Sequence, residues 1–109
     1  MIEIKNETEK VILVGVSLSD QDDTKESLEE LKDLVSTAGA ETVGMVIQNR
    51  EQQHPGTYVG KGKIEELKSM IWELRATGIV CDDELSPAQM KNLQDELDVK
   101  VMDRTLIIL

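Results

Sequence analysis

Val11-Ile12-Leu13-Val14-Gly15-Val16 is a short and nearly continuous apolar run. Such a run is typical of a strand that is buried on both faces, as in parallel sheets. Three later segments are also predicted to be strands, and they lie at Thr42–Gln48, Ile79–Cys81 and Lys100–Asp103. The sequence therefore predicts four strands.

Segments with apolar residues at helical spacing separate these strands. The first helix is predicted from Thr24 to Ala38, the second from Lys61 to Ala76, and the third after Ser86. Each carries one apolar stripe, which is typical of a helix that packs against a core. The stripes contain Leu28, Leu31, Leu34, Val35 and Ala38 in the first helix, Ile64, Leu67, Ile71 and Leu74 in the second, and Met90, Leu93 and Leu97 in the third.

Local signals mark the ends of these helices. Asp23 and Glu26 have the spacing of a capping box before the first helix. Ser86-Pro87-Ala88-Gln89 has the same spacing before the third helix, with proline at the first helical position. Gly39 and Gly78 are predicted to end the first and second helices.

Strands and helices alternate along the chain in the order β-α-β-α-β-α-β. This order favours an α/β fold with a four-stranded parallel sheet and three crossover helices on both faces. Because crossovers are right-handed, few strand orders remain, and we expect 2-1-3-4. The helix at 24–38 is expected on one face and the other two on the opposite face. With 109 residues, the chain is predicted to be a single domain over 1–109.

Composition narrows the classes of function. The net charge is −10, from 12 basic and 22 acidic side chains, so any contact with RNA needs a local basic patch. No apolar run approaches the roughly 20 residues that span a bilayer, so membrane insertion is not expected. Cys81 is the only cysteine, which fits a reducing, cytoplasmic location.

The apolar end Leu106–Leu109 suggests a chain cut from a longer protein; the alternative is a natural edge strand.

The segment Gly56–Lys63 resembles a phosphate loop without matching one. Five residues separate Gly56 from Gly62, and Ile64 stands where a P-loop has its hydroxyl. A narrower interpretation remains, because glycines at a helix start allow close approach to an anion and lysines add charge. Gly60, Lys61, Gly62 and Lys63 are therefore candidates for contact with RNA phosphate or a nucleotide. The alternative is a glycine-rich turn with two solvated lysines.

Other chemistry-bearing residues form no convincing catalytic or metal-binding set. Asp82-Asp83-Glu84 follows a strand, where a role at the next helix N-terminus is favoured over metal binding. His54 is predicted to be a surface residue, and Cys81 a buried residue of the third strand. Trp72 lies off its helix's stripe and indicates either a second contact surface or a partly buried side chain. No catalytic residue is predicted.

Three segments together resemble the N-terminal domain of the HflX family. They are Thr57–Leu67, with the helix start Gly60-Lys61-Gly62-Lys63; Asp82–Leu93, with Leu85-Ser86-Pro87-Ala88-Gln89-Met90-Lys91-Asn92-Leu93; and Val101–Leu109, with Asp103-Arg104-Thr105. The resemblance is specific from Thr57 to Leu109, whereas the first half matches mainly in layout. Lys61 departs from the family, which commonly has a small residue there.

The resemblance implies a role that spacing alone does not give. HflX-type proteins continue into a helical segment and a GTPase domain that uses GTP and Mg²⁺, and they bind the large ribosomal subunit to split or rescue ribosomes. This chain would then be a recognition module that contacts ribosomal RNA, without a cofactor of its own and without GTP hydrolysis. The loops at Asn49-Arg50 and Asp103-Arg104 are further contact candidates. In some members of the family the N-terminal region is linked to ATP binding.

Two other functions remain open from the residues. One is a stand-alone α/β domain that binds a nucleotide such as ATP, or acts as an enzyme, at the strand ends. Its candidate residues would be Ser17, Ser19, Asn49, Arg50, Asp82 and Asp103. The other is a purely structural interaction domain.

Overall fold

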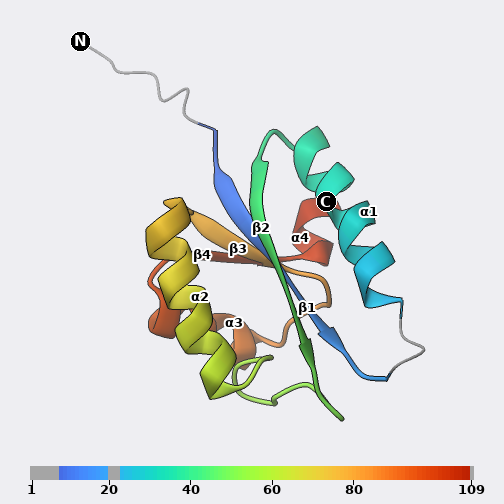
Figure 1. The fold of residues 1–109 in the computed structure, drawn as a ribbon, viewed down its shortest axis with the longest axis vertical. Helices are drawn as coiled ribbons and strands as arrows, with labels where there is room; N and C mark the ends of the chain where they lie inside the picture. The colour runs from blue at the N-terminus through green and yellow to red at the C-terminus, as the bar shows by residue number, and fades with distance from the viewer. Residues whose placement is uncertain (1–7, 20–22, 109) are drawn as a thin grey trace.

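The computed structural model describes residues 8–19 and 23–108. In these residues strands and helices alternate along the chain, as predicted, and a short additional helix follows the last strand (Figure 1). The elements are β1 (Lys10–Ser17), α1 (Thr24–Thr37), β2 (Glu41–Asn49), α2 (Lys61–Leu74), β3 (Gly78–Cys81), α3 (Pro87–Leu97), β4 (Lys100–Asp103) and α4 (Arg104–Ile108).

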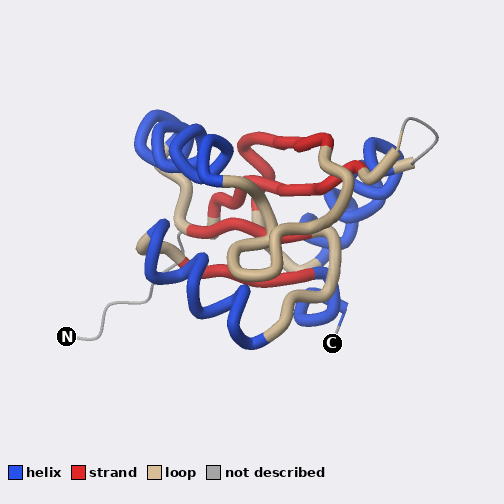
Figure 2. Tube along the Cα trace, turned by 90° about the horizontal axis from the view of Figure 1, so that it is seen from below, coloured by secondary structure: helices blue, strands red, loops and turns tan. Residues whose placement is uncertain are grey.

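The strands form one four-stranded sheet in the order β2-β1-β3-β4, and every pair is parallel. This confirms the predicted α/β class and strand order. Helices α1 and α4 lie on one face of the sheet, while α2 and α3 cover the other (Figures 1 and 2). The predicted sides of the three crossover helices are therefore correct.

The central strand β1 explains why its sequence is apolar throughout. Val11 and Leu13 pack with Leu28, Leu31 and Val35 of α1. The alternate residues Ile12, Val14 and Val16 point into the opposite, larger cluster beneath α2 and α3. Successive side chains of a strand face opposite sides, so a strand between two helical layers needs apolar residues at nearly every position.

Gly15 interrupts this run because α1 passes close to it. A Cβ atom there would lie 2.8 Å from Cγ2 of Thr24 and 3.2 Å from Cδ1 of Leu28. The absence of a side chain in β1 lets the first turns of α1 approach the sheet.

The helix α4 was not predicted. The apolar residues after Asp103 were interpreted as a cut chain end or an edge strand, yet Arg104–Ile108 is helical and Ile107 packs on the α1 side. The cause is a local cap, because Oδ1 of Asp103 accepts a hydrogen bond from the Leu106 backbone N–H at 3.0 Å. Leu109 lies outside the described residues.

None of the described helices has the length and apolar character needed to cross a membrane.

Two helix-end predictions were wrong. Asp23 precedes α1, but its side chain makes no capping bond, since its backbone (φ −97°, ψ 35°) is outside the extended geometry of most N-caps. Helix α2 ends at Leu74, before a left-handed Arg75 (φ 56°), and Gly78 instead begins β3. Gly39, with φ 96°, lies just past α1 as predicted.

The capping box of α3 is confirmed. The Gln89 backbone N–H donates to Oγ of Ser86 at 3.1 Å, and the Ser86 N–H donates to Oε1 of Gln89 at 3.0 Å. We expect Ser86→Ala to lower the free energy of unfolding by about 0.5–2 kcal/mol, because a helix N–H loses its acceptor. Urea unfolding followed by circular dichroism measures it. Ser69→Ala, at an exposed site in α2, is the control; an equal loss in both variants would contradict a capping role.

Candidate functional site

The candidate residues lie along one edge of the sheet, where the parallel strands end. Ser17, Asn49 and Asp103 are the last residues of β1, β2 and β4, and Asp82 follows β3. Loops at this edge are where parallel α/β sheets usually bind ligands. The candidates divide into one group beside the start of α2 and another between β3, β4 and α1.

The first group surrounds the N-terminus of α2. Gly60 is the N-cap, and its backbone N–H donates to Oε1 of Gln48 on β2 at 2.8 Å. The first helical hydrogen bond runs from the Ile64 N–H to the Gly60 carbonyl at 3.0 Å. The N–H groups of residues 61–63 therefore precede the helical ladder, which makes this end of α2 partly positive.

Arg50 joins this group across the loop. A Cβ atom on Gly60 would lie 2.6 Å from Nη1 of Arg50, so the guanidinium lies directly against the helix start. Two candidates that the sequence left separate, Asn49-Arg50 and Gly60–Lys63, are thus neighbours. A side chain at position 60 would displace the Arg50 guanidinium, whereas a Cβ on Gly62 would meet no atom within 4 Å.

The lysines differ in their surroundings. Lys61 is exposed and Lys63 is half-buried, with its Nζ 3.0 Å from Oε1 of Glu66. Within the part of the chain that the structure describes, neither Lys61 nor Arg50 forms an ion pair. The start of α2 therefore holds two cations whose charge no neighbouring carboxylate offsets through an ion pair.

An open hollow of about 380 Å³ adjoins Arg50 at the ends of β1 and β2. It is lined by Ser17, Leu18, Ser19, Asn49, Arg50 and Glu51. Hydroxyl, amide and guanidinium groups can all bind an anion, while Glu51 opposes one. The structure thus brings together most of the strand-end candidates of the alternative, nucleotide-binding interpretation; Asp82 and Asp103 are not among them.

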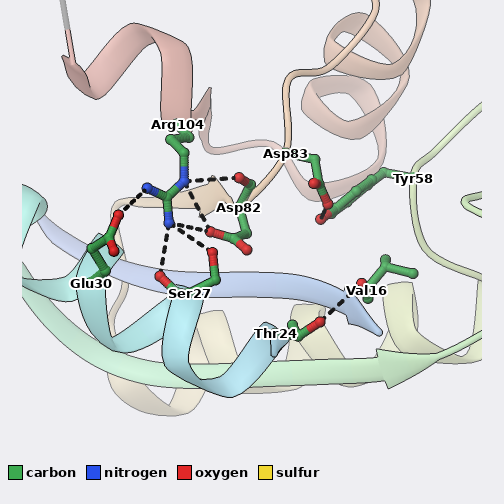
Figure 3. A network of polar contacts seen from close by, with 8 residues as sticks. All are labelled: Val16, Thr24, Ser27, Glu30, Tyr58, Asp82, Asp83 and Arg104. Carbon is green, nitrogen blue, oxygen red and sulfur yellow. Dashed lines mark hydrogen bonds and ion pairs between the residues drawn. The ribbon is translucent and has the colours of Figure 1, made fainter. Parts of the chain in front are cut away.

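The second group consists of Asp82, Asp103 and Arg104, whose side chains form hydrogen bonds within the fold. Asp103 is 3% exposed, and its Oδ2 accepts from the Leu85 backbone N–H at 2.8 Å. Arg104 donates to Oδ1 of Asp82 at 2.8 Å, to the carbonyl and Oγ of Ser27 at 2.8 and 2.9 Å, and to Oε1 of Glu30 at 3.1 Å (Figure 3). The polar atoms of both side chains therefore bond within the domain.

Tyr58 is a residue that sequence reasoning missed. It is fully buried, has a left-handed backbone (φ 69°), and its hydroxyl donates to Oδ2 of Asp83 at 2.6 Å (Figure 3). Burial, reinforced by the bond to Asp83, raises the pKa of the Tyr58 hydroxyl. The position of Tyr58 in the motif before Gly60 was the available signal, but the sequence did not show which carboxylate it meets.

His54 was predicted to be a surface residue, yet it organises the loop before α2. Its Nδ1 accepts from the backbone N–H groups of Gly56 and Thr57 at 3.0 and 3.1 Å. Gln89 and Asn92 of α3 donate to the carbonyls of His54 and Gly56, each at 2.9 Å. The motif on α3 thus holds the loop that leads into Gly60, so its residues act on the candidate site by positioning it.

Two single residues were given interpretations from the sequence. Trp72 is 85% exposed near the far end of α2, so its side chain is not partly buried, and its role as a second contact surface stays a prediction. Cys81 is buried in β3 as predicted, and burial raises the pKa of its thiol.

Among the described residues, no group of three or more His, Cys, Asp or Glu side chains could hold a metal ion.

Comparison with known proteins gives consistent matches. Residues 25–109 match the family described as GTP-binding GTPase N-terminal. The GTPase HflX of Lacrimispora saccharolytica is 67% identical over 109 residues, which are 100% of this chain and 26% of that protein. The GTPase HflX of Escherichia coli is 37% identical over 101 residues, 93% of this chain and 24% of that protein. The chain thus spans about a quarter of the length of these relatives.

A solved structure supports the fold alone. The crystal structure of the SsGBP and GDP complex matches with a TM-score of 0.67 at 22% identity, over 91% of this chain and 27% of that chain.

Proposed function

Because this chain belongs to the HflX family of GTPases, we propose that it is the N-terminal recognition domain of a cytoplasmic GTP-binding protein. In our proposal the full-length protein associates with the large ribosomal subunit and acts in splitting or rescuing ribosomes. This domain contributes contact with ribosomal RNA rather than catalysis.

The cationic start of α2 carries this proposal. Arg50 and Lys61 stand beside the first N–H groups of α2, and Lys63 lies two residues further along the same turn, in a chain whose net charge is −10. An acidic domain as a whole repels RNA, so a contact must come from a local group of this kind. Phosphate fits it best, because a helix N-terminus and guanidinium and ammonium groups all favour oxyanions.

The described residues include neither a phosphate loop nor a metal-binding cluster of the kind that GTP and Mg²⁺ require. The segment Gly56–Lys63 lacks the P-loop spacing, and the described carboxylates form no metal-binding cluster. We therefore assign GTP and Mg²⁺ binding to the region of the full-length protein that the relatives possess beyond the matched quarter.

The test is the double variant Lys61→Ala/Lys63→Ala in the full-length protein. We expect weaker binding to purified large subunits. A plot of log affinity against log salt should have a slope that falls by up to about two, one for each phosphate that a lysine no longer neutralises. Folding should change by about 1 kcal/mol or less, since Lys61 is exposed and the half-buried Lys63 loses only its ion pair with Glu66. Co-sedimentation across a salt series measures the affinity.

The matched control is Lys25→Ala/Lys32→Ala, which removes the same charge from exposed positions on α1, across the sheet from α2. The control should keep the wild-type salt slope. If both double variants lose affinity equally, net charge alone is responsible and the α2 start is not the contact. Wild-type affinity of the Lys61/Lys63 variant at every salt concentration would also refute the proposal.

The second candidate function is binding of a nucleotide such as ATP. The hollow at Ser17, Ser19, Asn49 and Arg50 favours it, because this is the strand-end edge where α/β sheets hold nucleotides. Calorimetric titration of the chain with ATP is the direct measurement. Saturable binding that is lost in Arg50→Ala would favour this function, and no heat of binding would leave the RNA contact as the better proposal.

A further inference from the structure

Helix α4 is too short to hold its own direction. It spans Arg104–Ile108, five residues, whereas isolated helices shorter than about 12 residues are marginal in water. Its orientation must therefore come from contacts with the rest of the domain. Among the side chains of α4 that the structure describes, Ile107 is partly buried against the cluster beneath α1 and Leu106 is 49% exposed, so their apolar packing supplies little of this.

The polar contacts of α4 are more extensive and come from its first residue. Arg104 reaches Ser27 and Glu30 on α1 with both terminal nitrogens, and it reaches Asp82 beyond β3 with Nε and Nη2 (Figure 3). Its side chain is 21% exposed and that of Asp82 is 9% exposed. Such a pair is screened less than ion pairs on the open surface.

The geometry requires arginine. The guanidinium presents five N–H donors in a planar fork, which lets one side chain bond a carboxylate, a carbonyl and a hydroxyl on two different elements. Lysine would keep the charge but would concentrate its donors at one point. Asp103 holds the other side of the helix start through the Leu85 and Leu106 backbone N–H groups.

We propose that Arg104 is a positioning residue that locks α4 onto α1 and the end of β3, and so fixes the direction in which the chain continues beyond this domain. The relatives are about four times as long as the matched part, so a large part of such proteins lies outside this domain. With Arg104 in place, the segment after α4 keeps a fixed direction relative to the loop that carries Arg50 and the start of α2 at Lys61. Without Arg104 the domain stays folded, but α4 becomes a hinge.

The experiment measures the distance between α1 and α4 in the full chain. Cysteines are introduced at Lys32 and Thr105, which are both exposed, and carry spin labels; the native Cys81 is buried and stays unlabelled. Pulsed electron paramagnetic resonance should give one narrow distance distribution in the parent. In Arg104→Lys it should become about twofold broader, because a five-residue helix without its anchor samples many directions.

A second variant and a control make the result decisive. Ser27→Ala removes only one acceptor of Arg104 and should give a smaller broadening of the same kind. Lys100→Ala breaks the exposed ion pair with Glu9 and should leave the distribution narrow. If Arg104→Lys lowers the unfolding midpoint while both it and Ser27→Ala keep the parental width, Arg104 only stabilises the fold and the proposal is overturned.

Discussion

Replacing Tyr58 with alanine is expected to lower the free energy of unfolding by about 3–5 kcal/mol, the range for truncating a large buried aromatic side chain. Tyr58 is among the largest fully buried side chains and packs in the cluster beneath α2 and α3. It also lies just before the start of α2. We therefore expect Tyr58→Ala to loosen the loop that places Gly60 as well as to destabilise the domain.

Tyr58→Phe separates packing from the hydrogen bond. The ring remains, so only the bond from the hydroxyl to Asp83 is lost, and the expected loss is about 1 kcal/mol because water can reach the half-buried carboxylate. Urea unfolding followed by circular dichroism measures both variants. Trp72 fluorescence is a poor probe, since that side chain is already exposed in the folded chain. A loss below about 1 kcal/mol in Tyr58→Ala would contradict the packing of this loop.

Asp103→Ala is expected to lower the free energy of unfolding by about 2–4 kcal/mol, because two backbone donors lose their acceptor. Leu85 would keep a buried N–H without a partner, which costs about 1–3 kcal/mol. The Leu106 N–H would lose the cap of α4, which costs about 0.5–2 kcal/mol. Asp103→Asn keeps one acceptor oxygen and should fall between the parent and the alanine variant.

Asp95→Ala is the matched control for Asp103. Asp95 forms an exposed ion pair with Lys91 on α3, and such pairs contribute about 0–1 kcal/mol. The sequence placed Asp103 among the possible RNA contacts, so full-length Asp103→Ala should also be tested against large subunits. Wild-type stability together with reduced binding would make Asp103 a contact residue and contradict the structural role.

The fold was predictable because its signals are local or follow from general topology. The run over residues 11–16 marks a strand buried on both faces, and β1 is indeed central with helices on both sides. The Ser86–Gln89 capping box lies within four consecutive residues, so it could be identified without the structure. The prediction failed at Asp23, where the same spacing was present but the backbone did not adopt the capping geometry.

The candidate site was predictable only in its parts. Gly60–Lys63 and Asn49-Arg50 are both contact candidates from the sequence, but their proximity depends on how the loop between β2 and α2 returns to the sheet. Helix α4 was missed because its residues are apolar and its cap, Asp103, was interpreted as a strand-end contact residue.

The sequence by itself determined the four strands, the three crossover helices, their order, the parallel sheet and the family, because periodicity, caps and motifs are contained within short stretches of chain. The tertiary structure alone decided which polar side chains are free to meet a ligand. Tyr58 bonds a carboxylate 25 residues away, and Arg104 bonds Ser27 across 77 residues. No local pattern specifies such partners, since they are chosen by the packing of helices on both faces of the sheet. Because of that packing, Arg104 forms its hydrogen bonds within the domain, whereas Arg50 and Lys61 remain at the surface.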